Sequence, residues 1–143
     1  MRPFVFATLL TSLIAMNANY AQGAVQTPAA GSAERKALLD TVRPPLEKRL
    51  HQPVMFVVDH LRVAGDWAFL EAQMQSAGGK SLSYAGTEFE EAAKAGVKSD
   101  IYAALLQRNG TQWTVKAEAI GPTDVAWANW SQAYGAPESV FGE

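Results

Sequence analysis

Two tight-turn dipeptides, each lying between two strand-like runs, constrain the fold of this chain more than any other feature. Asn109-Gly110 is the strongest short signal for a β-hairpin, because both residues accept the positive φ angles of a two-residue turn. Gly65-Asp66 also separates two runs rich in β-branched and aromatic residues, VMFVVDHLRV and WAFLEAQM. Because strands joined by such short turns pair antiparallel, the sequence predicts an antiparallel sheet of about four strands.

The first hairpin has a register that sorts its side chains onto two faces. With a two-residue loop at Gly65-Asp66, the apolar face carries three facing pairs: Val57 with Met74, Leu61 with Leu70, and Val63 with Ala68. The polar face carries the other three: His60 with Glu71, Arg62 with Phe69, and Val58 with Gln73. Asp59 falls on the apolar face, where a buried carboxylate would need a partner. A slip of one residue would exchange the two faces, so the apolar set favours this register.

The second hairpin, with its loop at Asn109-Gly110, is predicted to divide in the same way. Its covered face consists of facing apolar residues: Tyr102, Ala104 and Leu106 opposite Ala117, Val115 and Trp113. The other face of its second strand is polar: Gln112, Thr114, Lys116 and Glu118. Both hairpins therefore predict one sheet with a covered face and a more polar face in water.

A helix is predicted before the first hairpin. Ser32 can cap it, and the run AERKALLDTV that follows has apolar residues every three to four positions, as one buried helical face requires. Pro44-Pro45 should stop or kink the helix at Arg43, because proline lacks a backbone donor. The helix should then resume to about Leu50.

Two further helices are predicted, one between the hairpins and one after them. Thr87 and Glu90 fit a capping box for a short helix over 88–95, and a short edge strand is expected over 81–85. A C-terminal helix should begin after Thr123 and end at Gly135, where glycine allows a left-handed cap. Beyond it, Val140 and Phe141 are expected to attach the tail to the body of the domain.

The first residues have the layout of a secretory signal peptide. Arg2 precedes an apolar run from Phe4 to Ala15, and small residues follow that run. The run is about twelve residues long, shorter than the roughly twenty that a transmembrane helix needs, so we expect no stable membrane anchor. We therefore predict a signal peptide over 1–23, a flexible leader over 24–31 and a single α+β domain over 32–143, in a periplasmic or secreted protein.

Composition argues against several kinds of partner. The formal net charge of −2 offers no electrostatic basis for binding nucleic acid. With no cysteine, stability in an oxidising compartment must come from the core, to which four Trp, four Tyr and six Phe contribute. The two histidines, His51 and His60, lack the spacing of a zinc site, and no phosphate-binding or dinucleotide pattern occurs. We therefore expect no metal and no cofactor.

Three runs of the chain carry a family resemblance. LRVAGDWAF, YAALLQRNGTQWTV and AIGPTDVAWANW resemble stretches of small exported bacterial proteins that carry no assigned function, and the resemblance spans Ser32 to Phe141. The predicted order of helix, hairpin, insert, hairpin and helix is similar to cystatin-like and NTF2-like domains. That resemblance implies an α+β fold with a kinked N-terminal helix on a curved antiparallel sheet. It implies no catalytic residue, because NTF2-like domains include enzymes, binders and dimerisation modules.

His60 and Glu71 are the candidate catalytic pair. Directly opposed strand residues have Cβ atoms about 5 Å apart, so Glu71 could orient His60 as a general base. Arg62, on the same face, could hold an anionic substrate. The alternative is a cross-strand pair on a solvated face, which is common and is usually worth less than ~1 kcal/mol.

The aromatic residues are the candidate binding residues. Trp127, Trp130 and Tyr134 fall on one face of the predicted C-terminal helix, and with Trp113 they could line an apolar pocket. The alternative is that this stripe is core that closes the open side of the sheet. Trp67 beside the first turn could instead mark a surface that contacts a partner.

Three functions remain open from the sequence. The leading hypothesis is a non-enzymatic binding module for a small apolar ligand or an exported protein. The second is a small NTF2-like acid/base enzyme, a lyase or isomerase, with His60 as base and Glu71 as its orienter. The third is an inhibitor or immunity-type protein that acts through a loop such as 78–86. A homodimer is compatible with each of them.

Overall fold

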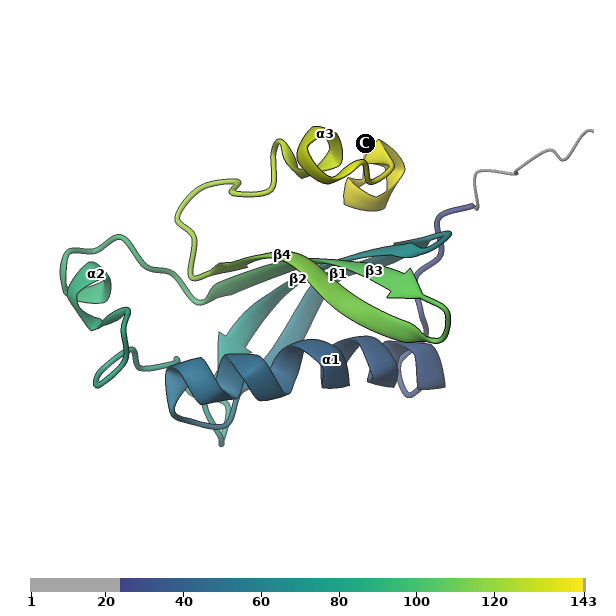
Figure 1. Ribbon diagram of the computed structural model, residues 1–143. Helices are drawn as coiled ribbons and strands as arrows, with labels where there is room; N and C mark the ends of the chain where they lie inside the picture. Colours follow the sequence, from purple (N-terminus) through teal and green to yellow (C-terminus); the bar gives the residue numbers. More distant parts are fainter. Residues whose placement is uncertain (1–23, 143) are drawn as a thin grey trace, which may run out of the picture.

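A four-stranded antiparallel sheet lies between a long helix and a C-terminal layer (residues 122–142) in the computed structural model, which describes residues 24–142 (Figure 1). The elements in chain order are α1 (Ala33–Leu50), β1 (Met55–Ala64), β2 (Trp67–Gln75), α2 (Glu90–Lys94), β3 (Ile101–Asn109), β4 (Gln112–Ile120), α3 (Trp130–Tyr134) and the 3₁₀ helix η1 (Glu138–Phe141). The strands lie in the order β1-β2-β3-β4. The predicted α+β class and its four-stranded antiparallel sheet are confirmed. The predicted signal peptide over 1–23 lies outside the described residues.

The first hairpin keeps its predicted register from the turn to a β-bulge at Asp59, and His60 faces Glu71 as predicted. Beyond the bulge the predicted pairings are wrong, because Val57 faces Gln73 there. A bulge adds one residue to a strand, so side chains beyond it change face. Val57 is accordingly 46% exposed instead of facing the α1 core. Asp59 is exposed as well, and it needs no buried partner.

The second hairpin turns one residue later than predicted. Asn109 belongs to β3, and the loop begins at Gly110, whose φ is 64°. The predicted facing pairs are therefore wrong, because Leu106 faces Val115 and not Trp113, and Tyr102 faces Ile120 and not Ala117. A bulge farther along β4 leaves Lys116 without a pairing partner. Glu118 consequently lies opposite Ala104, on the face that packs against α1, and the prediction that it belongs to a wet polar face is wrong.

Helix α1 runs without a break through Pro44 and Pro45, so the stop predicted at Arg43 does not occur. Ser32 caps the helix as predicted, by accepting a hydrogen bond from the N–H of Arg35 at 3.2 Å. Four side chains on both sides of the prolines are buried against the sheet: Leu38, Val42, Leu46 and Leu50. This packing outweighs the backbone donors that the two prolines remove. A kink at this point stays a prediction.

Both faces of the sheet are buried, where one covered face was predicted. On the α1 side, the helix packs against residues from all four strands. On the other side, a second cluster joins Phe69 and Leu105 of the sheet to Trp130 and Val140 of the C-terminal layer. The residues of β3 from Tyr102 to Leu106 are all buried, and such a continuous apolar strand is typical of a sheet with covers on both faces.

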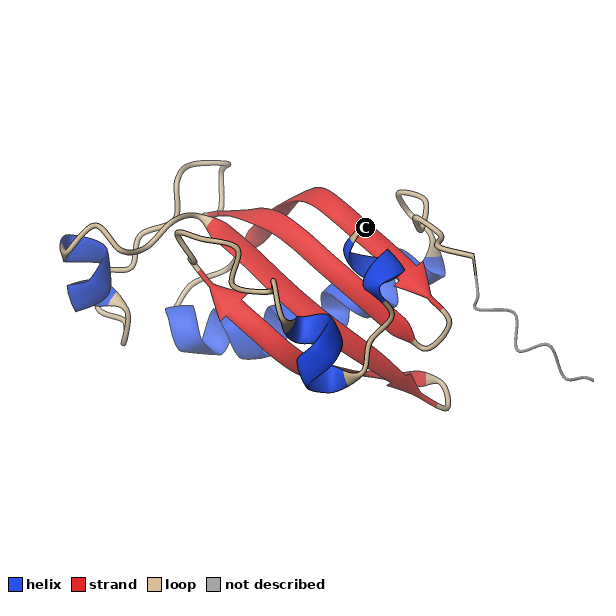
Figure 2. Cartoon of the chain, turned by 90° about the horizontal axis from the view of Figure 1, so that it is seen from above, coloured by secondary structure: helices blue, strands red, loops and turns tan. Residues whose placement is uncertain are grey.

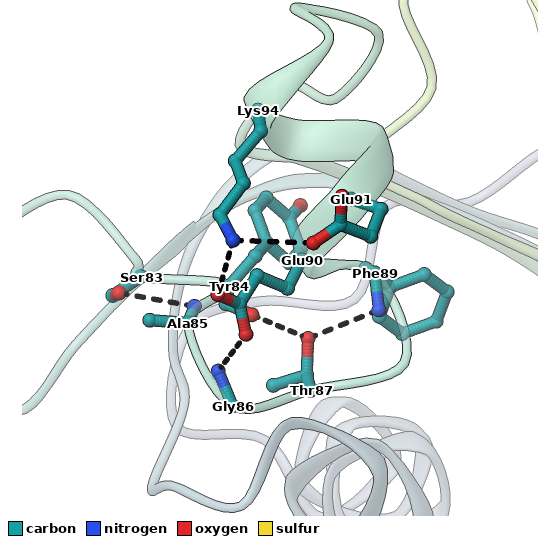
Figure 3. Close-up of polar contacts among 9 residues, drawn as sticks. All are labelled: Ser83, Tyr84, Ala85, Gly86, Thr87, Phe89, Glu90, Glu91 and Lys94. Carbon is teal, nitrogen blue, oxygen red and sulfur yellow. Dashed lines mark hydrogen bonds and ion pairs between the residues drawn. The ribbon is translucent and has the colours of Figure 1, made fainter.

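The insert between β2 and β3 (residues 76–100) contains α2, which is shorter than the predicted helix over 88–95. The predicted capping box does not form as expected. The hydroxyl of Thr87 accepts a hydrogen bond from the N–H of Phe89 at 3.1 Å, while the Glu90 carboxylate accepts one from the N–H of Gly86 at 2.8 Å (Figure 3). In a capping box, Thr87 would accept from the N–H of Glu90, and Glu90 would accept from the N–H of Thr87. Here each side chain accepts from the N–H that lies one residue earlier in the chain.

Two short segments add single bridges at the sheet. Gln26, within the predicted leader, pairs antiparallel with Val63 of β1 through two backbone hydrogen bonds of 2.8 Å. Ser81 forms an antiparallel bridge with Gln75 of β2, next to the hydrogen bond that the N–H of Ser76 donates to the carbonyl of Lys80 at 2.9 Å, so the predicted edge strand is reduced to one bridge. The chain therefore contacts the sheet before α1 begins, although the domain was predicted to start at Ser32.

The C-terminal layer begins as a series of turns, so its helix starts at Trp130 and not directly after Thr123 as predicted. Gly135 ends α3 with a φ of 74°, which confirms the predicted left-handed cap. The predicted attachment of the tail is also confirmed, because Val140 is fully buried and Phe141 packs against the second cluster. In Figure 1 this layer lies above the sheet, and in Figure 2, which is seen from above, it lies in front of the sheet.

Candidate functional site

The sheet face under the C-terminal layer carries side chains in rows that run across the strands. The first three rows are Val57, Gln73 and Ile101, then His60, Glu71 and Ala103, then Arg62, Phe69 and Leu105. The bulge at Asp59 is what places Val57 and His60 on the same face, since an unbroken strand alternates its side chains between faces.

The C-terminal layer covers the third row and stops short of the first. In the third row, Phe69 is 1% exposed. Its ring packs against three aromatic rings, those of Trp127, Trp130 and Phe141, with centroids 5.7, 6.4 and 4.9 Å away. In the first row, Val57 and Gln73 are exposed. The edge of the covered area therefore falls at the second row, which contains Glu71.

A groove of about 470 Å³ lies at this edge. Its walls come from the sheet, the end of the insert and the start of the C-terminal layer: Glu71, Ser99, Ile101, Pro122, Thr123, Asp124, Val125 and Trp127. The volume lies within the roughly 300–1,000 Å³ that is usual for small-molecule sites. The groove is thus large enough for a small ligand, and it is open to solvent along its length.

Backbone hydrogen bonds hold the end of the groove where the chain leaves β4. The N–H of Gly121 donates to the carbonyl of Ile101 at 2.7 Å, and the N–H of Ser99 donates to the carbonyl of Gly121 at 2.9 Å. The Ser99 hydroxyl donates to the carbonyl of Pro122. A Cβ on Gly121 would lie only 2.7 Å from the Ser99 carbonyl oxygen, so glycine permits this close approach. This wall is therefore preformed.

The groove combines apolar surface with negative charge. Ile101 and Trp127 are half-buried in its walls. Glu71 and Asp124 also line it, and neither carboxylate forms an ion pair with any residue from 24 to 142. Carboxylates beside an aromatic ring can attract a cation through charge and through the face of the ring. The arrangement suits a ligand with an apolar body and a cationic group.

The candidate catalytic pair lacks the geometry of a base held by its carboxylate. His60 faces Glu71, but within residues 24–142 its ring makes a different contact, because its Nδ1 lies 3.2 Å from an Nη of Arg62. A guanidinium can only donate, so this Nδ1 is the acceptor and a neutral ring carries its proton on Nε2. His60 is exposed and does not line the groove, whereas Glu71 does.

Arg62 links the sheet to the C-terminal layer. Its guanidinium donates a hydrogen bond to the backbone carbonyl of Phe141 at 3.2 Å, in addition to its contact with His60. Both contacts hold the guanidinium of Arg62 against other groups of this chain, and not toward a ligand in the groove. The structure therefore assigns Arg62 a role in holding the tail, and it brings Arg62 and Glu71 onto one face without pairing them.

The five aromatic residues predicted to bind a ligand lie in different environments. Trp127 lines the groove, and Trp130 is buried in the second cluster. Tyr134 is 42% exposed and belongs to neither core. Trp113 packs on the α1 side of the sheet, and Trp67 packs against the second cluster instead of standing free at the hairpin tip. The structure thus places one of the five, Trp127, at the groove.

A charged network on the α1 side attaches the insert to the rest of the domain. Arg49 of α1 forms ion pairs with Glu88 at 2.6 Å and with Glu118 at 2.9 Å, and its guanidinium lies 5.1 Å from the ring centre of Phe89. Burial lowers the pKa of Arg49, but the nearby carboxylates of Glu88 and Glu118 raise it by more. Burial, and then the charge of Glu118, raises the pKa of Tyr102, whose hydroxyl donates to that carboxylate at 2.8 Å. These groups satisfy one another, so we assign them a structural role.

Sequence reasoning missed most of the groove. Ile101, Pro122 and Val125 were not predicted to form a site, and Asp124 was expected only in the first turn of a helix. One signal was present, because the run IYAALLQ is apolar at nearly every position, which indicates a strand with both faces covered. Such a strand predicts that a layer covers the second face of the sheet, and this layer must end somewhere along that face.

Metal and membrane sites find no support in the described part of the chain. No group of three or more His, Asp or Glu residues within 24–142 is arranged to hold a metal ion. None of the helices in this range is both long enough and apolar enough to cross a membrane.

Comparison of the chain with models of protein families, with curated proteins and with solved structures finds no match.

Proposed function

We propose that this protein is a non-enzymatic binding module, whose groove beside Glu71 and Trp127 holds an apolar group of a ligand together with a cationic one. The observation that carries this proposal is the groove of about 470 Å³, whose apolar walls carry two carboxylates without an ion-pair partner in residues 24–142. The ligand that fits has an apolar body, which contacts Ile101 and Trp127. Its cationic group is directed toward Glu71 and Asp124.

Each interaction in such an open groove contributes little, and this sets the expected affinity. An exposed carboxylate stabilises a bound cation by ~0.2–1 kcal/mol. The face of a tryptophan adds about 0.5–1 kcal/mol. At roughly 0.3–0.5 kcal/mol per non-hydrogen atom, an aromatic amine of about nine such atoms should have a dissociation constant on the order of 1–10 mM. A ligand that binds more tightly than this must be larger than a simple aromatic amine.

We also propose that the module acts outside the cytoplasm, in the periplasm or in the medium. The support is the apolar run from Phe4 to Ala15 after Arg2, which has the pattern of a signal peptide. A cystatin-like or NTF2-like fold, with a kinked α1 on a curved sheet, belongs to the same proposal and is supported by the order of the elements. A homodimer stays a prediction.

The two alternative functions stay predictions with less support. For an acid/base enzyme, His60 would need a free ring nitrogen to accept a proton, but its Nδ1 already accepts a hydrogen bond from Arg62. For an inhibitor or immunity-type protein, the loop over 78–86 would need to present its side chains to a partner. Two of its largest side chains, Leu82 and Tyr84, are buried in the domain instead.

Three matched phenyl compounds test the proposed function. Phenethylamine, 2-phenylethanol and phenylacetate share an apolar ring and carry a cation, no charge and an anion. Ligand-observed NMR titrations should show that phenethylamine binds in the millimolar range and at least about threefold more tightly than the other two. Glu71→Gln should weaken phenethylamine about two- to fivefold.

The control variant is Glu91→Gln, which neutralises an exposed carboxylate on α2 that does not line the groove. We expect it to bind phenethylamine like the wild type. Equal binding of the three compounds, or equal effects of the two variants, would argue against the groove as a site for cationic ligands.

A further inference from the structure

A second, smaller hollow adjoins the groove at Val125 and Trp127. Both residues line it as well as the groove, and its volume is about 210 Å³. Its remaining walls belong to the C-terminal layer: Ala128, Ser131, Gln132, Glu138 and Phe141. Small-molecule sites usually measure roughly 300–1,000 Å³, so this hollow suits one side chain of a ligand and not a whole ligand.

The ridge between the groove and the second hollow is apolar and exposed. Val125 is 59% exposed, the largest exposed fraction among the large hydrophobic residues described. Trp127 beside it is half-buried. An exposed apolar ridge with a depression on each side marks a contact surface for a partner that can lie across it. A compact ligand would occupy one depression, whereas an extended chain can occupy both.

Negative charge continues from the groove into the second hollow. Glu71 and Asp124 line the groove, Glu138 lines the second hollow, and no Lys or Arg between residues 24 and 142 lines either of them. Like the two carboxylates of the groove, that of Glu138 forms no ion pair with residues 24–142. Charge complementarity therefore favours a partner that presents basic side chains on both sides of the ridge.

We propose that the groove and the second hollow are two halves of one site, which binds an extended peptide segment of a partner protein; this conclusion rests on the proposed function and names the class of its ligand. Alternate side chains of an extended chain point the same way and lie about 6.4–6.8 Å apart. Three alternate residues can thus place a basic side chain near Glu71, an apolar one on Val125, and a second basic one near Glu138. Recognition of this kind reads alternate side chains through separate pockets.

Fluorescence anisotropy with four labelled peptides tests this proposal. The first has the sequence Gly-Lys-Ala-Phe-Ala-Lys-Gly with blocked ends, so its lysines and its phenylalanine alternate. In the other three peptides glutamine replaces the first lysine, the second lysine or both. At low salt we expect each lysine to tighten binding to the wild type about two- to fivefold. The differences should shrink at roughly 1 M salt, where screening acts over about 3 Å.

Variants of the protein show where each lysine lies. Glu138→Gln should weaken the two-lysine peptide about two- to fivefold and leave phenethylamine unchanged, while Glu71→Gln should weaken both ligands. Glu91→Gln should change neither. Equal binding of the four peptides to the wild type, or no effect of Glu138→Gln on the two-lysine peptide, would overturn the peptide site.

The two proposals can fail separately. Phenethylamine binding without lysine-dependent peptide binding would overturn the peptide site and leave the proposed function intact. Absence of phenethylamine binding would count against the proposed function itself. A second copy of this chain is the remaining possible occupant of the surface, and analytical ultracentrifugation tests for it. If the protein forms a dimer that Val125→Ser dissociates and that the peptides do not disrupt, the surface is a dimer interface and the proposal is overturned.

Discussion

Replacement of Phe69 by alanine tests whether the C-terminal layer is a packed part of the fold. Phe69 is 1% exposed on the second face of the sheet. Its ring is the one against which Trp127, Trp130 and Phe141 pack. Because Trp127 is also a wall of the groove, loss of the Phe69 ring should disturb both the stability of the domain and the shape of the site.

The expected loss can be worked out from these contacts. A buried Phe→Ala substitution costs about 3–5 kcal/mol, because apolar contacts are lost and a cavity remains. Each pair of aromatic rings contributes about 0.5–1.5 kcal/mol beyond its buried area, which favours the upper half of that range. Small domains have a free energy of unfolding of about 5–15 kcal/mol, so Phe69→Ala should remove a large part of it. Phe69→Leu keeps much of the volume and should cost about 1–2 kcal/mol.

Urea unfolding followed by circular dichroism measures both variants against the wild type. Tyr134→Ala is the matched control, because Tyr134 lies in the same layer but is 42% exposed and belongs to neither core. It should change the free energy of unfolding by less than about 0.5 kcal/mol. A loss below about 1 kcal/mol for Phe69→Ala would refute the reasoning, since the ring could then not be packed between the sheet and the layer.

Two further predictions concern the turn after β4 and its surroundings. Gly121 and Gly110 both have a φ of 64°, but only at Gly121 would a Cβ approach a backbone oxygen, that of Ser99, to 2.7 Å. Gly121→Ala should therefore destabilise the domain clearly more than Gly110→Ala in urea unfolding, and equal losses would contradict the tight approach. Burial, and then the charge of Asp100, raises the pKa of Tyr84 from 10.0 to about 12. The unfolded chain loses this proton first, so stability from Tyr84 is complete below about pH 10 and is lost as the pH rises to about 12. The melting temperature of the wild type should fall more steeply with pH over this range than that of Tyr84→Phe. An equal fall in both proteins would contradict the burial of the Tyr84 hydroxyl.

Local signals predicted the sheet, and the errors in its register arose at the two bulges and at the second turn, which lies one residue later than predicted. The turn at Gly65-Asp66 predicted the pairing of β1 and β2 as far as His60. The bulge that follows could not be predicted from the pattern, because positions 57 and 58 are both valine and either side chain could face the core. In α1, tertiary packing of leucine and valine side chains outweighed the two prolines, so the helix does not stop at Arg43 as they predicted.

The groove could be predicted only in part, because its walls are distant in the sequence. Glu71 and Trp127 were both candidates, for catalysis and for binding, and the structure brings both to the groove. Their meeting depends on the C-terminal layer, which joins residues of β2 to residues 122–127. No spacing rule connects positions that far apart in the chain. Trp113 was grouped with Trp127 on chemistry alone, and the register of β4 puts it on the opposite face.

The most direct test of ligand binding in the groove is a map of phenethylamine binding by protein NMR. Titration into isotopically labelled protein should shift the indole N–H of Trp127 and the amides of Ile101 and Asp124 more than other signals, in a saturable way. Glu71→Gln should reduce these shifts at the same ligand concentration. Shifts that do not saturate, or that are largest at Trp113 on the α1 side of the sheet, would contradict the proposed site.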